Sequence, residues 1–222
     1  MPGSSNKAVI WDMDGVIIDT APYHLKVWQE VFRKSGVNFT EEQFRQSFGQ
    51  RNDAIIRSVL GEEVSQYELD SISAEKEENF RLKIRQNIKP LAGVIGLMKS
   101  LAECRFKMAL ASSAPIENIQ LLIRGLGIDK RFQSIISGDY VAEGKPSPQV
   151  FLLAAEKLGI KPRRCVVIED AVAGVTAARR AGMHCVAVTN THPEASLSEA
   201  DLVVSSLEAV TVDVLDRILN TR

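Results

Sequence analysis

Short apolar segments alternate along most of this chain with longer segments that have the period of an α-helix. Strands are expected at 7–11, 106–111, 134–137, 164–168, 184–188 and 202–204. Helices are expected near 93–104, 115–126, 147–158, 171–181 and 207–219. Strands that alternate with helices in this way form parallel sheets with helices packed on them. The sequence therefore predicts an α/β fold around a parallel sheet.

Residues 19–87 interrupt this alternation. They contain no convincing strand, only amphipathic helical patterns such as 22–35 and 65–86. The second of these is rich in charge, which is typical of a solvated helix face. A loop between a strand and a helix is rarely this long. We therefore expect a small helical domain at 19–87, inserted after the first strand, and a second domain formed by 1–18 together with 88–222.

The composition limits the classes of partner. With 27 basic and 28 acidic residues the net charge is −1, so no bulk basic surface for nucleic acid is expected. No apolar run approaches the length of a membrane span, and the start of the chain lacks a stretch like a signal peptide. Cys104, Cys165 and Cys185 are widely spaced, which favours a reducing compartment. A cytoplasmic protein, monomeric and bound to neither nucleic acid nor membrane, is expected.

Two carboxylates follow the first expected strand, in the segment Asp12-Met13-Asp14-Gly15. On an extended backbone, side chains two residues apart point the same way. Paired carboxylates at the end of a buried strand repel each other and lose hydration, so they need a cation or a shared proton. Ligands of open α/β sheets bind at this end of the strands. A plain polar loop is the alternative interpretation.

A second acidic pair, Glu169-Asp170, follows the apolar strand at 164–168. In a parallel sheet this strand can lie near the first one, which would bring four carboxylates together. Such a cluster predicts a hard cation that prefers oxygen ligands, and Mg²⁺ fits that description. Taken alone, Asp170 could instead be a helix N-cap.

Two further segments supply hydrogen-bond donors and positive charge. Ser112 ends an expected strand and precedes a helix, where a hydroxyl and free backbone N–H groups favour an anion. Lys145 lies in the loop Gly144-Lys145-Pro146, also before a helix. The plainer alternatives are a simple helix cap for Ser112 and a solvated side chain for Lys145. A nucleotide-binding P-loop is excluded, because its spacing is wrong and Pro146 stands in place of the Ser or Thr.

The order of these motifs resembles the haloacid dehalogenase-like (HAD) hydrolase superfamily. They are DxDGVxxD from residue 12, a strand that ends in Ser112, GKP before a helix, and ED after an apolar strand. The resemblance covers essentially the whole chain. It implies the HAD fold, a Rossmann-like three-layer core with a parallel sheet, and a small all-α cap of subclass I at 19–87. Within the superfamily, the sequence resembles the β-phosphoglucomutases and the sugar-phosphate phosphatases.

The resemblance also implies roles for the motif residues. Asp12 would be the nucleophile that forms an aspartyl-phosphate. Asp14 would be the general acid and base. Ser112 and Lys145 would hold the phosphoryl oxygens and neutralise their charge. Mg²⁺ would be bound by Asp12, the backbone carbonyl of Asp14 and Asp170, with Glu169 binding it directly or through water.

The cap sequence bears on what accepts the phosphoryl group. Thr20 and His24 resemble the mutase pattern at the entrance to the cap. Mutases then carry a Lys-Gly pair and, three residues after the Gly, an Arg that grips a second phosphate. Here Phe48 precedes Gly49 in place of the Lys, and Asn52 occupies the position of that Arg, with Arg51 one residue early. The residues expected to contact substrate are Thr20, His24, Gly49, Arg51, Asn52, Lys76, Ser113 and Ala114.

Loss of the second phosphate clamp affects a mutase more than a phosphatase. We therefore expect Mg²⁺-dependent hydrolysis of a small phosphorylated metabolite, in particular a sugar phosphate. The alternative is a β-phosphoglucomutase, which converts β-glucose 1-phosphate to glucose 6-phosphate. A third possibility is a non-catalytic binding or regulatory protein of the same fold, but such proteins should lose Asp12 or Asp14, and both are present. Lys76 has charged neighbours, so a solvated position is its plainer interpretation.

Overall fold

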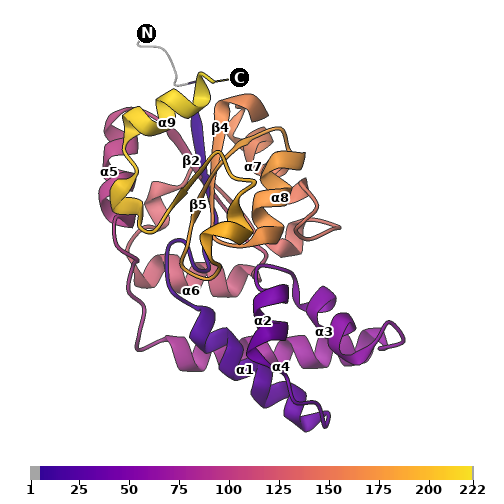
Figure 1. Ribbon diagram of the computed structural model, residues 1–222. Coiled ribbons are helices and arrows are strands. Elements are labelled where there is room, and N and C mark those ends of the chain that lie inside the picture. Colours follow the sequence, from indigo (N-terminus) through magenta and orange to yellow (C-terminus); the bar gives the residue numbers. More distant parts are fainter. Residues whose placement is uncertain (1–5, 222) are drawn as a thin grey trace.

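A parallel sheet of six strands forms the centre of the molecule (Figure 1). The computed structural model describes residues 6–221, so residues 1–5, which belong to the segment examined for a signal peptide, lie outside the description. The strand order is β3-β2-β1-β4-β5-β6. The α/β class and all six predicted strands are confirmed, with ends that shift by at most one residue. The strands are β1 (Ala8–Trp11), β2 (Lys107–Ala111), β3 (Ser134–Ile136), β4 (Cys165–Glu169), β5 (His184–Val188) and β6 (Leu202–Val204).

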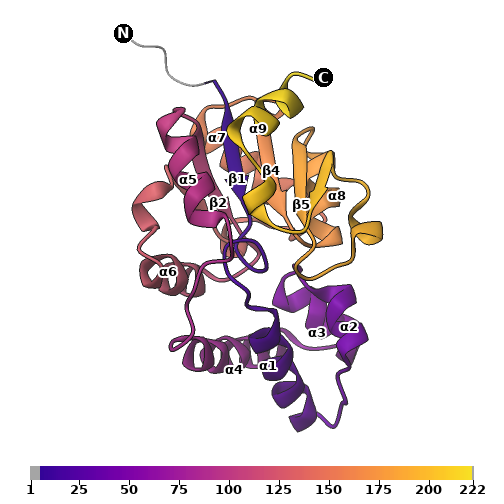
Figure 2. The ribbon, with the colours of Figure 1, turned by 60° about the vertical axis from the view of Figure 1, so that its left-hand side comes forward.

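Helices cover both faces of this sheet, which confirms the three-layer core. In β1, Val9 and Trp11 pack into one apolar cluster, whereas Ala8 and Ile10 pack into another on the opposite face. This alternation follows from the two-residue period of a strand. The first cluster is covered by α5 (Val94–Glu103), α6 (Ile116–Gly125) and α9 (Val212–Leu219), and the second by α7 (Gln149–Leu158) and α8 (Val172–Arg180) (Figures 1 and 2).

Two predicted helix starts were wrong by a few residues. The helix expected from 207 begins at Val212, because a short 3₁₀ turn, Leu207–Ala209, precedes it. The helix expected from Ser147 begins at Gln149, and Pro148 is its N-cap. Gly127, Gly159 and Gly182 lie where α6, α7 and α8 end and all have positive φ, which is common for glycines that end helices.

Four helices lie between β1 and α5 and are here called the cap; the rest of the chain is called the core domain. They are α1 (Ala21–Lys34), α2 (Glu41–Ser47), α3 (Asn52–Leu60) and α4 (Gln66–Ile84). Capping boxes at Thr40–Gln43 and Ser65–Glu68 begin α2 and α4. An apolar cluster formed by cap residues and Ala171 of the core domain stabilises the cap, which lies at the carboxyl ends of the strands (Figures 1 and 2).

None of the helices within residues 6–221 has the length and apolar character needed to cross a bilayer.

Candidate active site

The register of the two central strands brings the two acidic motifs together. β1 pairs with β4 in parallel, with Trp11 opposite Ile168, and the Asp12 N–H donates to the Ile168 carbonyl at 3.0 Å. Continuing this register by one residue places Asp12 beside Glu169. Side chains at even positions of β1 and odd positions of β4 share one face of the sheet, the face covered by α7 and α8. The expected proximity of these two strands is confirmed.

Gly15 turns the chain immediately after Asp14. Its φ is +77°, and a Cβ there would lie 1.8 Å from Asp170 Oδ2. The turn directs the Asp14 carboxylate toward the start of the cap. Thr20 Oγ1 donates to Asp14 Oδ1 at 2.6 Å, and His24 Nε2 lies 3.3 Å from the same oxygen. The carboxylates of Asp12 and Asp14 therefore both line the cavity described below but have different partners.

Three of the four carboxylates expected to converge do so, whereas that of Asp14 does not join them. Carboxylate oxygens of Asp12, Glu169 and Asp170 lie within 4.8 Å of one another, and all three residues are buried. Lys145 Nζ donates to Asp12 Oδ1 at 2.5 Å and also to Glu169 Oε1. The second Glu169 oxygen accepts the N–H groups of Asp170 and Ala171, at 2.8 and 2.9 Å. Lys145 is therefore not solvated but belongs to the acidic cluster.

The cluster carries more negative charge than Lys145 can neutralise. Burial raises the pKa of Asp12 to about 8, although Lys145 lowers it. Burial, together with Glu169 and Asp12, also raises the pKa of Asp170 well above its usual value. The one donor near the Asp170 carboxylate is the Thr191 hydroxyl, which lowers its pKa, and within the described part of the chain neither Asp170 oxygen makes a hydrogen bond of good geometry. Buried, unpaired carboxylate oxygens beside two further carboxylates are suitable ligands for a hard divalent cation.

Asp14 lies in a different electrostatic environment. Burial raises its pKa, but hydrogen bonds from His24 and Thr20 and the charge of Lys76 outweigh burial, so the pKa is lowered overall. His24 stacks on Phe80 at 4.0 Å between ring centres, and burial lowers its pKa. A neutral imidazole that faces a carboxylate donates its Nε2 proton. His24 is buried and contacts Asp14, which holds the Asp14 carboxylate in place.

The segment after β2 contributes small polar groups to the site. Ser112 Oγ accepts the Ala114 N–H at 3.1 Å and lies 3.5 Å from Asp14 Oδ2. Ser113 Oγ donates to the Gly49 carbonyl of the cap at 2.7 Å. The Ile116 N–H, at the start of α6, donates to the Asp139 carboxylate. Because this N–H is already bonded, it is not free to bind an anion. The sequence had suggested free N–H groups at the start of this helix.

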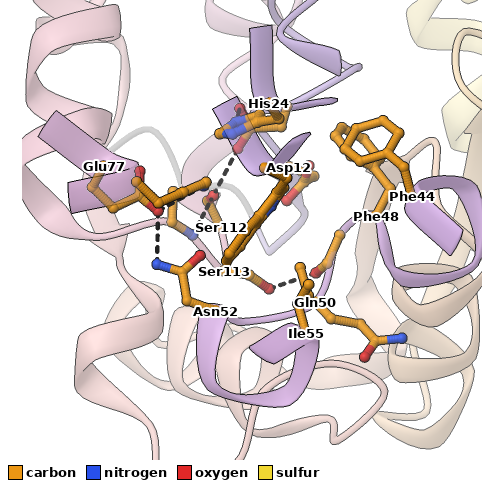
Figure 3. Close-up of a pocket in the computed structure, with 15 residues that line it drawn as sticks. Asp12, His24, Phe44, Phe48, Gln50, Asn52, Ile55, Glu77, Ser112 and Ser113 are labelled. Atoms are coloured by element: carbon orange, nitrogen blue, oxygen red, sulfur yellow. Dashed lines mark hydrogen bonds and ion pairs between the residues drawn. The ribbon is translucent and has the colours of Figure 1, made fainter. Parts of the chain in front are cut away.

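A cavity of about 40 Å³ lies between the cap and the core domain (Figure 3). A cavity of this volume has room for a few water molecules. The core domain contributes Asp12, Asp14 and the segment Ser112–Ala114. The cap contributes apolar side chains, among them Phe44 and Phe48, and polar residues that include His24, Gly49, Gln50, Asn52, Lys76 and Glu77.

Among the cap residues expected to contact substrate, Lys76 lines the cavity and Arg51 does not. Lys76 is only 3% exposed and lines the cavity, so its expected solvated position is wrong. Arg51 lies outside this cavity: its guanidinium donates to the Val141 carbonyl at 2.8 Å and pairs with Asp53 at 3.2 Å. Thr20 is buried and reaches the site through Asp14. Whether these residues contact substrate stays a prediction.

Sequence reasoning missed three buried polar residues at this boundary. Glu77 lines the cavity, and Asn118, at the start of α6, donates to it at 2.5 Å. His192 lies 3.1 Å from the Asp170 carbonyl and 2.9 Å from the Arg45 carbonyl of the cap. None of the three belongs to a compact motif, and only packing between distant segments places them here. The charge-rich pattern at 65–86 was the one available signal for Glu77, and it was interpreted as solvated.

Comparison with known proteins agrees with this geometry. Residues 6–182 match the model of the haloacid dehalogenase-like hydrolases. The fructose-1-phosphate phosphatase YqaB of Escherichia coli is 34% identical over 182 residues, which cover 81% of this chain and 95% of that protein. The β-phosphoglucomutase of Bacillus subtilis is 34% identical over 220 residues, 94% of this chain and 93% of that one. The crystal structure of a β-phosphoglucomutase from Clostridium difficile superimposes with a TM-score of 0.88 at 27% identity, and covers 96% of this chain and 97% of that one. The chain therefore belongs to the haloacid dehalogenase-like hydrolases, as a phosphohydrolase or phosphomutase.

Proposed function

We propose that this protein is a Mg²⁺-dependent phosphatase that hydrolyses a small phosphorylated carbohydrate. The observation that carries the proposal is the pairing of two buried aspartates with different environments at the floor of one cavity. Asp12 lies against Lys145 and the acidic cluster, whereas Asp14 lies against Thr20 and His24. The names of relatives, among them a fructose-1-phosphate phosphatase and a hexitol phosphatase, support the substrate class.

In the first step, a carboxylate oxygen of Asp12 attacks phosphorus while the bond from phosphorus to the sugar oxygen breaks. Asp14 donates a proton to that leaving oxygen. The negative phosphoryl group raises the proton affinity of Asp14, which supplies the acid form. Lys145 orients Asp12 and compensates the charge of the transferred group.

In the second step, Asp14 accepts a proton from water as the water oxygen attacks the aspartyl-phosphate. The bond between Asp12 and phosphorus breaks, inorganic phosphate leaves, and the Asp12 carboxylate is restored. Thr20 and His24 keep Asp14 oriented in both steps. Their hydrogen bonds lower the pKa of Asp14, and this favours the carboxylate that the second step requires.

Asp12, Glu169 and Asp170 would hold Mg²⁺. Their buried oxygen donors suit the ion, and neither Asp170 oxygen makes a hydrogen bond of good geometry within the described residues. Bound there, Mg²⁺ would act as a Lewis acid that offsets negative charge on the phosphoryl group. Lys145, which contacts two of the three carboxylates, would limit their repulsion before and after turnover.

A β-phosphoglucomutase is the second candidate, favoured by the relative from Bacillus subtilis that matches 94% of this chain. A mutase has to hold two phosphates in the closed site. Here Asn52 donates to Glu77 at 2.8 Å, and the Arg51 guanidinium is bonded to the Val141 carbonyl. These contacts leave the cavity without a guanidinium for a second phosphate and support hydrolysis.

The test is a phosphate-release screen over sugar phosphates, with and without Mg²⁺, run beside an assay for isomerisation of β-glucose 1-phosphate. We expect phosphate release that requires Mg²⁺ and is abolished in Asp12→Asn. Formation of glucose 6-phosphate without phosphate release would favour the mutase. Substantial phosphatase activity in Asp12→Asn would contradict the assigned nucleophile.

A further inference from the structure

Glu77 is a buried acid in the wall of the cavity, on the cap side. It extends from α4 beside Lys76, and its Oε1 accepts Lys76 Nζ and Asn52 Nδ2, each at 2.8 Å. Its Oε2 accepts Asn118 Nδ2 of the core domain at 2.5 Å. Arg81, one turn further along α4, fixes Asn118 from its other side through a hydrogen bond of 2.9 Å. Both Glu77 oxygens therefore have fixed partners.

These contacts keep Glu77 charged. Burial favours the neutral acid, but the Lys76 ammonium and the hydrogen bonds of Lys76 and Asn52 outweigh it and lower the pKa of Glu77. A buried carboxylate with several donors stays ionised at neutral pH. Glu77 is consequently a fixed counter-charge for the Lys76 ammonium beside it.

The same contacts cancel the positive charge of the cavity. Among the described residues that line it, Lys76 is the only lysine or arginine. Its ammonium is 2.8 Å from Glu77 and lies over the Trp28 ring, 5.1 Å from the ring centre. Figure 3 shows Asn52 and Glu77 on one side of the cavity and the rings of Phe44 and Phe48 on the other. Away from Asp12, the cavity thus offers apolar and neutral hydrogen-bonding groups and a neutralised ion pair.

We propose that Glu77 is a specificity-determining residue that restricts this site to substrates with a single phosphate and an uncharged, hydroxyl-bearing remainder. The proposal rests on the proposed phosphatase function and narrows its substrate class. Hydroxyl groups can donate to Glu77 and accept from Asn52 and Gln50, whereas a second phosphate or a carboxylate would find Lys76 already neutralised and would lie beside the Glu77 carboxylate. Like charges brought together in a desolvated site repel each other.

The test compares two substrates that share one sugar, fructose 1-phosphate and fructose 1,6-bisphosphate, through the ratio of their kcat/KM values. We expect the wild-type protein to favour the monophosphate. Glu77→Gln keeps the size and the acceptor oxygen but removes the charge and releases Lys76. In this variant the ratio should shift toward the bisphosphate by at least about 10-fold. The matched control is Glu78→Gln, on the same helix but exposed, and it should leave the ratio unchanged.

A purely structural role for Glu77 makes a different prediction. Loss of a cap–core hydrogen bond would lower kcat/KM for both substrates together and leave their ratio unchanged, and that result would overturn the proposal. If Glu77→Gln does not fold, Asn52→Asp serves instead. It adds a second carboxylate to the wall and should shift the ratio further toward the monophosphate; an unchanged ratio would again contradict the proposal. If the wild-type protein hydrolyses neither of the two fructose phosphates nor p-nitrophenyl phosphate, the proposed function itself is overturned.

Discussion

Gly15 connects the conformation of one residue with the assembly of the acidic cluster. Its φ of +77° belongs to the region that residues with a Cβ rarely adopt, and Asp170 Oδ2 occupies the space that a Cβ would need. Gly36 in the cap has the same φ, but nothing lies within 4 Å of a Cβ there. Alanine substitutions at these two glycines therefore distinguish the effect of backbone strain from that of steric contact with Asp170.

We predict that Gly15→Ala lowers phosphatase activity by at least about 100-fold, because Asp170 has to move away from Asp12. Gly36→Ala should lose only about 1–2 kcal/mol of unfolding free energy through the left-handed backbone and should keep its activity. Thermal unfolding and initial-rate measurements on both variants check this. Equal losses of activity would show that strain alone, and not contact with Asp170, makes Gly15 necessary.

The three cysteines should differ sharply in reactivity. Burial raises the pKa of Cys165 to about 12 and that of Cys185 well above its usual value, and both side chains are buried. Cys104 is exposed. Because the thiolate is the reactive form, we predict that one thiol per chain reacts rapidly with Ellman's reagent in the native protein and three react after denaturation. Cys104→Ser should remove the rapid phase; rapid reaction of all three native thiols would contradict the buried positions.

Site residues could be predicted from the sequence where they lie next to one another, or nearly so, in a short motif. Asp12 and Asp14 are two residues apart, Glu169 and Asp170 are neighbours, and each pair follows an apolar strand. Glu77 could not be recognised in this way. Its partners Asn52 and Asn118 lie 25 and 41 residues away along the chain, and only the packing of α3, α4 and α6 unites them.

At the scale of helices and strands, periodicity predicted which segments are strands but not their order. The edge strands β3 and β6 have three residues each and are partly buried, whereas the inner strands have four or five residues and are almost entirely buried. The length of an apolar run can therefore separate edge strands from inner strands, but it does not give the order of the inner four. The strand order 3-2-1-4-5-6 arises from parallel crossover connections, which place β4 beside β1. The short cap helices α2 and α3 were not assigned individually, because each has too few residues to show a clear helical period.

Two glycines inside helices should respond in opposite ways to alanine. In α8, a Cβ on Gly174 would lie 1.8 Å from Glu169 Oε1, the oxygen that binds Lys145. In α5, a Cβ on Gly96 would meet nothing within 4 Å. We predict that Gly96→Ala raises the unfolding free energy by up to about 1 kcal/mol through helix propensity alone. Gly174→Ala should lower it and reduce activity, because Glu169 is displaced from Lys145.

Denaturant unfolding and phosphate release measured on both glycine variants test this contrast. A Gly174→Ala protein as stable and active as Gly96→Ala would show that Glu169 can move without consequence for the site.

At the scale of the whole molecule, the cap is closed over the core domain. Hydrogen bonds join the two at several points: Ser113 to Gly49, Arg51 to Val141, Asn118 to Glu77, Arg81 to Asn118, and His192 to Arg45. The cavity between them has room for a few water molecules, which is too little for the proposed sugar-phosphate substrate. We therefore expect substrate entry and product release to require motion of the cap, as of lids in many enzymes.

A disulfide across this boundary tests whether cap motion is required for turnover. A Cβ built on Gly144 would lie 3.4 Å from the Cβ of Arg51, close to the separation found in disulfides. In a Cys104→Ser background, we predict that oxidised Arg51→Cys/Gly144→Cys turns over at least about 10-fold more slowly than the same protein after reduction. The single variant Gly144→Cys controls for the change beside Lys145 and should not respond to reductant. Equal rates in the oxidised and reduced double variant would mean that substrate reaches Asp12 without opening the cap, because the crosslink holds α3 against the loop that precedes Lys145.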